Sequence, residues 1–247
     1  MKELKPNYAE LSDVNFLLLK HGFCLLDSAK VIQWMGCSAD EVSNLSSDWD
    51  DMPHDKYLKD GGRYRRRRHS SFIVENDNLT QVPHRAHWQS LDYNALHGGM
   101  ERWFEPVLDT TIAKPAWSKI LYKLAQTATQ LTQPEQKKWC IEAHQFRIDT
   151  SDGIGRPTPE GAHRDGVNFV AVFMVNRQDI KGGETRVFDA NGPHGERFTL
   201  SEPWSLLLLD DTRMIHESTP IQPLKTSGYR DTLVVTLSQN LFQNAAV

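Results

Sequence analysis

The second half of the chain carries the pattern that most restricts the fold, because from about residue 139 it reads as a series of short apolar strands. Glycine-rich steps of the kind found in turns separate these strands. Many short strands joined by such turns predict a β-sandwich or a barrel. The strands are expected at Trp139–Ile148, Phe169–Val175, Glu184–Phe188, Trp204–Leu209 and Thr232–Leu237.

The first half of the chain mixes helix and strand patterns. The most regular helix is predicted over residues 115–132, whose apolar side chains form one stripe at helical spacing. An earlier helix is expected to end at Gly22, and two others to be capped by Ser28 and Ser38. Together the two halves predict a chain that is mainly β with some α.

The bulk composition disfavours several classes of partner. The net charge is -4, from 28 basic and 32 acidic residues, whereas broad nucleic-acid or anionic-membrane binders are usually basic. The longest apolar run, Phe169–Val175, has seven residues, and a membrane span needs roughly 20. Cys24, Cys37 and Cys140 lack CxxC spacing, which argues against a zinc ribbon or a disulfide framework. We therefore expect a cytoplasmic protein without a membrane partner.

The motif most suggestive of chemistry is His163-Arg164-Asp165, with His216 53 residues later. On a strand, residues i and i+2 point to the same side, so His163 and Asp165 can converge on one cation. Two imidazoles and one carboxylate on one face of an octahedron leave three positions open, as in non-haem Fe(II) oxygenases. The triplet alone also fits two surface polar residues on a turn, but the apolar strands next to both histidines favour a metal site.

A second polar pair follows 14 residues after His216. Arg230 and Thr232 enter the last predicted strand and share one of its faces. A guanidinium binds a carboxylate through two hydrogen bonds, and the hydroxyl can add another. The pair therefore suits the distal carboxylate of 2-oxoglutarate, while an exposed arginine at a strand start is the common alternative.

In this order, the residues resemble the Fe(II)/2-oxoglutarate-dependent dioxygenases. More narrowly, the chain is similar to the bacterial free L-amino-acid hydroxylases of the L-isoleucine 4-hydroxylase type. The resemblance covers about residues 60–240. Beyond the metal and arginine motifs, it rests on Tyr64–Arg68, Gln145–Ile148, Pro159–Gly166, Asn176–Arg177, Gly182–Thr185 and Leu209–His216.

The resemblance implies an enzyme that decarboxylates 2-oxoglutarate to succinate and CO2 and hydroxylates a small substrate. A free aliphatic L-amino acid such as isoleucine or leucine is the expected substrate. Its cofactors would be Fe(II), 2-oxoglutarate and O2, with ascorbate as a stimulant. By the same resemblance, His163, Asp165 and His216 hold the iron, and Arg230 with Thr232 holds 2-oxoglutarate.

The resemblance also implies a double-stranded β-helix, the jelly-roll or cupin-like core, buttressed by N-terminal helices. We expect a single dioxygenase domain over residues 1–247. Residues 1–135 would form a mixed α/β buttress that also covers the substrate. Residues 136–247 would form the jelly-roll core with the metal site.

Four further residues are candidates for binding 2-oxoglutarate or the substrate. Gln145 and Arg147 share a strand face and can meet a carboxylate, unless they form the polar face of an edge strand. Glu160 lies three residues before His163 and can pair with a substrate ammonium. Asp211 is an alternative for that role, or the cap of a turn.

The run Arg63–Arg68 has three interpretations: a solvated strand, a nucleic-acid patch, or a strand with alternate arginines facing inward to a substrate carboxylate. We favour at least one arginine in the site and take Arg67 as the candidate. A non-enzymatic cupin-like binding module and a nucleic-acid-directed dioxygenase remain the alternative functions. The other histidines are interpreted as surface or packing residues: His69, His84, His87, His97, His144 and His194.

Overall fold

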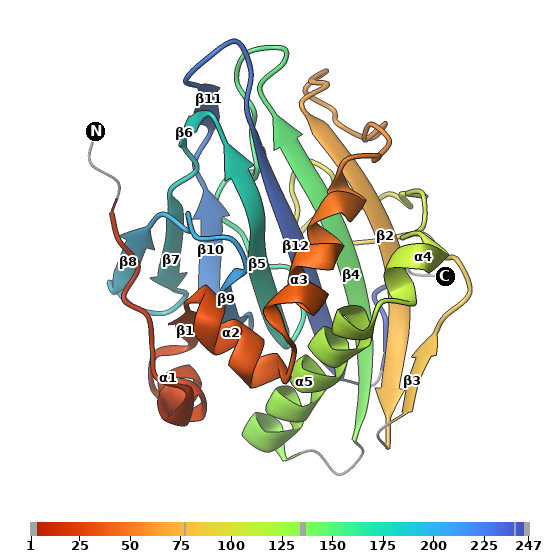
Figure 1. The fold of residues 1–247 in the computed structure, drawn as a ribbon, viewed down its shortest axis with the longest axis vertical. Coiled ribbons are helices and arrows are strands. Elements are labelled where there is room, and N and C mark those ends of the chain that lie inside the picture. The colour runs from red at the N-terminus through yellow and green to blue at the C-terminus, as the bar shows by residue number, and fades with distance from the viewer. Residues whose placement is uncertain (1–3, 77, 134–136, 240, 245–247) are drawn as a thin grey trace.

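One seven-stranded antiparallel sheet forms the centre of the computed structural model, which describes residues 4–76, 78–133, 137–239 and 241–244 (Figure 1). The first half of the chain supplies β1, β2 and β3, so both halves contribute to this sheet. In spatial order, its strands are β1 (Phe23–Leu26), β9 (Ser205–Asp210), β5 (Phe169–Gln178), β12 (Tyr229–Gln239), β4 (Lys138–Asp149), β2 (Arg65–Glu75) and β3 (Asn78–Gln81).

Helices cover one face of the large sheet, and Figure 1 shows α2, α3 and α5 lying across it. The main apolar core fills this interface and includes Trp117 of α5 and Phe173 of β5. No helix of the described residues is long and apolar enough to cross a membrane. The helices are η1 (Leu11–Asp13), α1 (Val14–His21), α2 (Ser28–Met35), α3 (Ala39–Ser46), η2 (Ser47–Trp49), α4 (Asp109–Ile112) and α5 (Pro115–Thr132).

Two small sheets lie against the other face. A second apolar cluster joins Val172 of β5 and Leu207 of β9 to Val187 of β7 and Met214 of β10. The first small sheet has the order β10-β7-β8 and the second pairs β11 with β6. Their strands are β6 (Ile180–Gly182), β7 (Thr185–Asp189), β8 (Gly195–Phe198), β10 (Met214–Ser218) and β11 (Ile221–Pro223).

The alternation of side chains in β2 and β4 decides which residues reach the inside. Ile141 and Ala143 of β4 pack in the helix-side core, so His144 and Phe146 face the other way. On β2, Arg67 is buried on that same inner side. The inner face of these two strands is therefore unusually polar, and it forms one wall of a cavity.

The expected pattern of strands is confirmed, with a few local differences. Asp27, not Ser28, caps α2, because its carboxylate accepts a hydrogen bond from Lys30 N. Ser38 caps α3 in a full capping box, as expected. His216 lies in the middle of β10 rather than at a strand end. The expected boundary between the halves, near residue 135, lies outside the described residues.

Candidate metal centre and active-site cavity

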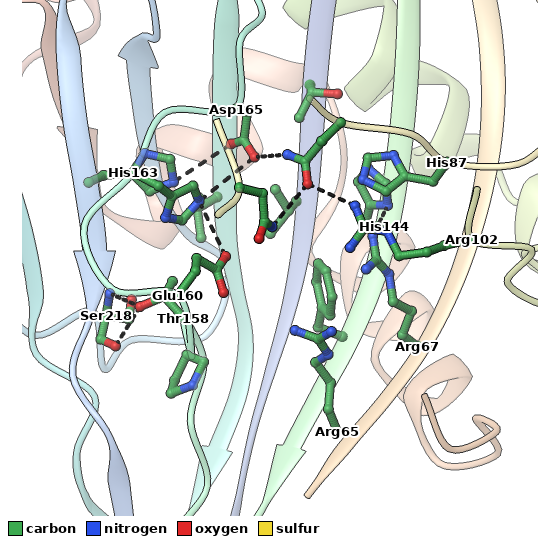
Figure 2. A pocket seen from close by; sticks show the side chains of 18 of the residues that line it. Arg65, Arg67, His87, Arg102, His144, Thr158, Glu160, His163, Asp165 and Ser218 are labelled. Carbon is green, nitrogen blue, oxygen red and sulfur yellow. Dashed lines mark hydrogen bonds and ion pairs between the residues drawn. The ribbon is translucent and has the colours of Figure 1, made fainter. Parts of the chain in front are cut away.

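A cavity lies between the inner face of the large sheet and β10. It is lined from β2, β4, β5, β10 and β12, and from two irregular segments, residues 157–165 and 82–106. Figure 2 shows His163, Asp165 and Glu160 gathered on one side, with Arg67 and Arg102 on the other. The two sides therefore offer different chemistry to anything that binds between them.

His163, Asp165 and His216 bring their ligand atoms within 4.8 Å of one another. His163 Nε2 lies 3.8 Å from Asp165 Oδ1, and His216 Nε2 lies 3.8 Å from Asp165 Oδ2. These distances are too long for hydrogen bonds and leave room for one small cation. Two imidazole nitrogens and a carboxylate form a donor set that suits Fe(II).

Backbone pairing fixes the two histidines side by side. His163 N donates to His216 O at 3.0 Å, and His216 N donates to His163 O at 2.9 Å. His163 Nδ1 lies 3.0 Å from Gly161 O, so Nδ1 carries a proton and Nε2 is the nitrogen that can bind a metal when the ring is neutral. The side chain of His163 is thus prepared to act as a ligand.

The charge environment keeps the second histidine neutral. Burial and the neighbouring His163 lower the pKa of His216 to about 3, so its ring is uncharged near neutral pH. Burial favours the neutral form of His163 as well, but Asp165 and Glu160 raise the pKa of this residue. Negative charge beside the two rings is what a bound cation requires.

Asp211 supports the turn that follows Asp165. Its carboxylate accepts hydrogen bonds from the backbone nitrogens of Asp165 at 3.0 Å, Gly166 at 2.7 Å and Val167 at 3.0 Å. Asp211 is 1% exposed and is not among the cavity-lining residues. This geometry matches the expected turn cap and gives no contact with a substrate.

Gln89 connects the two sides of the cavity. Its Nε2 donates to Asp165 Oδ1 at 3.0 Å, while its Oε1 accepts from Arg102 Nη2 at 2.9 Å and Asn94 Nδ2 at 3.2 Å. Because two donors occupy Oε1, the orientation of the amide is fixed. Gln89 therefore holds one oxygen of Asp165 in place.

Arg230 projects into the cavity from β12. It is 5% exposed, and its Nε has no partner among the described residues. Burial and the nearby Arg177 lower the pKa of Arg230 to about 10, which leaves it charged at neutral pH. Thr232 is buried two residues further along the strand, but it does not line the cavity.

Gln145 and Arg147 share one strand face, as expected, but it is the face turned away from the cavity. The side chain of Arg147 binds Asp231 at 2.7 Å and Asp50 at 3.0 Å. Gln145 is fully buried and does not line the cavity. Alternation along β4 explains both positions, because odd-numbered residues such as Ala143 face the helices.

The arginine run is an inward-facing strand and not an exposed patch. Arg65 and Arg67 line the cavity. Arg66 Nη1 donates to Met52 O at 3.3 Å, and Arg68 Nη1 donates to Pro106 O at 3.1 Å. Each arginine of β2 thus either binds a backbone oxygen of the chain or faces the cavity. The interpretation of the run as a nucleic-acid patch therefore loses its support.

Glu160 lies on the metal-cluster side of the cavity. Its Oε1 is 3.7 Å from His163 Nε2, and its Oε2 is buried without a partner among the described residues. The carboxylate therefore has one oxygen free to accept a hydrogen bond from a ligand in the cavity.

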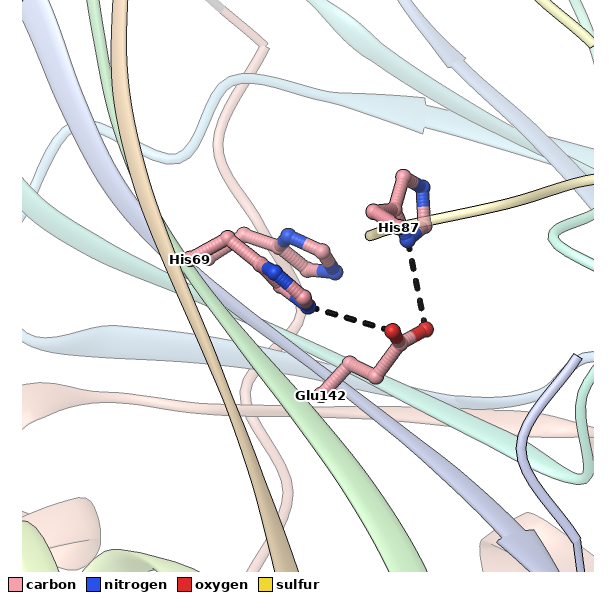
Figure 3. A group of neighbouring side chains, drawn as sticks. His69, His87 and Glu142 are labelled. Carbon is pink, nitrogen blue, oxygen red and sulfur yellow. Dashed lines mark hydrogen bonds and ion pairs between the residues drawn. The ribbon is translucent and has the colours of Figure 1, made fainter. Parts of the chain in front are cut away.

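A second group of histidines surrounds Glu142 (Figure 3), and two of its members, His87 and His144, line the cavity. His69 Nε2 is 3.1 Å from Glu142 Oε1, and His87 Nδ1 is 3.2 Å from Glu142 Oε2. His144 stacks on His69 with ring centroids 4.7 Å apart. These four residues, which we call the inner histidine cluster, also bring their ligand atoms within 4.8 Å of one another.

Sequence patterns did not indicate the contribution of segment 82–106. It supplies His87, Gln89, Asn94 and Arg102 to the cavity, but it has no periodic pattern from which to infer their direction. Backbone hydrogen bonds of 2.9 and 3.0 Å between His87 and Arg102 hold its ends together. A glycine is required at Gly98, because a Cβ there would collide with two backbone carbonyls of the segment.

Known proteins provide an independent comparison. The structure is similar to that of a bsmA homolog from Methylobium petroleophilum PM1, with a TM-score of 0.92 and 49% identity over 98% of each chain. It is also similar to IDO from Bacillus thuringiensis, with a TM-score of 0.77 and 20% identity over 94% of this chain and all of that one. These matches show that the two proteins share the fold of this chain.

The sequence comparisons agree with the fold. L-isoleucine-4-hydroxylase from Bacillus thuringiensis is 24% identical over 203 residues, which cover 80% of this chain and 82% of the relative. A sequence model described as 2OG-Fe dioxygenase matches residues 46–236, most of the chain. The chain therefore belongs to the 2OG-Fe dioxygenase family and is a 2-oxoglutarate-dependent dioxygenase that uses Fe(II) and O2.

Proposed function

We propose that this dioxygenase hydroxylates a free L-amino acid, with aliphatic residues such as isoleucine and leucine as the first candidates. The observation that supports this most is the two-sided cavity. A metal-binding group and Glu160 lie on one side. On the other side lie Arg67 and Arg102, which have no acidic partner among the described residues. The similarity to L-isoleucine-4-hydroxylase points to the same class of substrate.

His163, Asp165 and His216 are the proposed Fe(II) ligands, and Arg230 is the proposed partner of the distal carboxylate of 2-oxoglutarate. Thr232 is a proposed neighbour of that carboxylate. Gln145, Arg147 and Asp211 are not assigned a ligand, because their side chains are engaged or lie away from the cavity. Glu160 is proposed to bind the substrate ammonium, and Arg67 the substrate carboxylate.

In this proposal, the iron and 2-oxoglutarate supply the oxidising chemistry when bound. The protein binds and orients the reactants and keeps water away from them. His216 presents a neutral nitrogen, and Gln89 keeps Asp165 in a single orientation. Segment 82–106 covers the arginine side of the cavity and thereby limits the ways in which a substrate can enter.

The architecture fits a jelly-roll, which we propose as the core of one domain over residues 1–247. Two antiparallel layers that face each other across an apolar cluster support this proposal. Strands from both halves share the large sheet, which supports a single unit. A cytoplasmic location is also proposed, because Cys24 and Cys37 are free thiols.

The proposal is tested with purified protein, Fe(II), ascorbate, 2-oxoglutarate and a panel of L-amino acids. We expect one or more aliphatic amino acids to raise succinate formation and to gain one oxygen atom, as measured by mass spectrometry. If none raises succinate above the substrate-free rate, the proposed substrate class is wrong.

A matched pair of arginine variants tests the 2-oxoglutarate assignment. Arg230→Ala is expected to raise the KM for 2-oxoglutarate about 10–100-fold, since a charge-assisted pair is lost. Arg186→Ala is the control, because that arginine lies on β7 and pairs with Glu184 and Glu217 outside the cavity. Equal KM values in both variants would contradict the assignment.

A further inference from the structure

We propose that Arg67 and Arg102 together form a carboxylate subsite, distinct from Arg230, that binds the carboxylate of the substrate. The inference rests on the proposed function and specifies its substrate class. The ligand of this subsite is a zwitterion, with its carboxylate on the two arginines and its ammonium on Glu160.

Arg67 is a buried cation without an acidic partner. It is 5% exposed, and the described residues provide it with no ion pair. Its Nη2 donates to His144 Nδ1 at 2.8 Å, and its Nε has no partner. The guanidinium lies 3.8 Å from the ring centroid of Phe104 and 4.5 Å from that of Phe146. Two aromatic faces and a neutral histidine position it without neutralising its charge.

Arg102, like Arg67, is a buried cation without an ion pair among the described residues. It is 2% exposed, its Nη2 binds the amide oxygen of Gln89, and its Nε has no partner among the described residues. Burial, and then repulsion from Arg65, lower its pKa to about 10. For Arg67, burial and the charge of Arg102 shift the pKa in the same direction. Each cation raises the cost of charging the other.

The acidic groups nearest to these arginines have other partners. Asp55 pairs with Arg65 at 2.7 Å. Glu142 pairs with Arg85 at 3.0 Å and also accepts from His69 and His87. Two guanidinium groups therefore face the cavity without a direct ion pair among the described residues, an arrangement that is costly when it is buried. An anion bound between them would remove that cost.

The subsite is separate from the proposed 2-oxoglutarate site. Arg67 lies on β2 and Arg230 on β12, and β4 runs between these two strands. Neighbouring strands are about 4.8 Å apart, so the two strands are separated by roughly 10 Å. The two arginines therefore enter the cavity from different strands, and the cavity offers positions for two different carboxylates.

Glu160 supplies the complementary charge. It lies across the cavity from the two arginines (Figure 2), and its Oε2 is buried without a partner among the described residues. Val172, Val234 and Phe146 give the lining an apolar part. A molecule with a carboxylate, an ammonium and an aliphatic side chain matches these three parts of the wall.

The test measures equilibrium binding without turnover. The full chain is loaded with Co(II) and 2-oxoglutarate and titrated calorimetrically with each aliphatic L-amino acid, and then with the carboxamide of the one that binds most tightly. The amide keeps the shape and the ammonium but lacks the negative charge. We expect the wild type to bind the acid about 100-fold more tightly than the amide.

Two variants complete a thermodynamic cycle. Arg67→Met and Arg102→Met are each expected to weaken binding of the acid about 10–100-fold and to leave the affinity for the amide unchanged. Arg66→Met is the matched control, because that side chain lies on the opposite face of the same strand. If either methionine variant does not fold, Arg67→Lys and Arg102→Lys take its place, with a smaller loss of acid binding expected.

Several results would overturn the subsite. One is an acid and amide that bind the wild type equally. Another is an equal loss of acid and amide affinity in the methionine variants, or a loss confined to 2-oxoglutarate. A wild type that binds none of the amino acids would also overturn it. Succinate formation with a non-amino-acid substrate would contradict the proposed function instead, so the two failures are distinguishable.

Discussion

Two clusters of histidine and carboxylate border the same cavity, and both have ligand atoms within 4.8 Å of one another. They differ in how their polar atoms are satisfied. In the inner histidine cluster, Glu142 is hydrogen-bonded to His69 and His87 and also pairs with Arg85. In the cluster of His163, Asp165 and His216, the ligand atoms are 3.8 Å apart and do not bond to one another.

This difference shows that proximity alone does not identify a metal site. The carboxylate of the inner histidine cluster already has three donors, one of which is the cationic Arg85. Arg67 donates to its third histidine, His144, and a dication there would face two guanidinium groups. The other cluster has a carboxylate with one oxygen still available and no arginine bound to its ligand atoms. The open cluster is therefore suited to a metal, and the closed one to positioning its neighbours.

The largest expected effect comes from substituting one histidine in each of the two clusters. His163→Ala should abolish metal binding and turnover, because one of three proposed ligands is lost. His69→Gln should leave one Co(II) bound per chain, since we expect the inner histidine cluster to bind no metal. Calorimetric metal titration with succinate assays checks both. A His69→Gln protein that loses a bound metal ion would remove the distinction.

The next largest effect concerns stability. Glu142→Gln should lower the free energy of unfolding by about 3 kcal/mol or more, because Arg85 and two buried histidines lose their anion. Glu217→Gln is the control, since its pair with the half-exposed Arg186 is worth under about 1 kcal/mol. Urea unfolding of both variants provides the measurement. An equal loss of unfolding free energy in both variants would show that the charge of Glu142 does not stabilise the fold.

A smaller effect is expected at the hydrogen bond that connects the two sides of the cavity. Gln89→Leu should weaken Co(II) binding about 10-fold, because Asp165 loses the donor that orients it. Ser90→Ala is the matched control in the same segment, since its hydroxyl has no partner among the described residues. Unchanged Co(II) affinity in Gln89→Leu, at an unchanged Tm, would show that Gln89 does not position the ligand.

The smallest effect is a pH dependence of stability. Burial lowers the pKa of His87 to about 4, below its unfolded value of about 6.5. The unfolded chain therefore takes up a proton that the folded chain does not. This loss of stability begins as pH falls through about 6.5 and amounts to about 1–2 kcal/mol by pH 5. His87→Gln should reduce the change in unfolding free energy between pH 7 and pH 5, as measured by urea unfolding. His194→Gln, at an exposed site, should leave that change as it is in the wild type. The same change in both variants would refute this prediction.

The sequence allowed the strands of the second half and the helix at 115–132 to be predicted, because their apolar periods are long and regular. The grouping of His163, Asp165 and His216 followed from their spacing and from the neighbouring strands. Alternation also predicted that Gln145 and Arg147 share a face. It did not reveal which face, since that depends on how the helices pack against the sheet.

Other parts of the site could not be predicted from the sequence. Gln89 and Arg102 lie in an irregular segment, whose course depends on contacts distant in sequence. His87 was interpreted as a surface or packing residue, yet it lies in the inner histidine cluster and lines the cavity. The short strand β10 was missed because its apolar pattern is brief, and with it the pairing of His216 to His163.

The backbone pairing of His163 with His216 has a consequence for how the sequence of this chain can diverge during evolution. Their separation is set by a pair of direct hydrogen bonds, and not by the length of the chain that joins them. The turn at residues 191–194 lies between them in sequence and is exposed. Insertions there should leave the two histidines in register, so this loop can diverge while the metal site is retained.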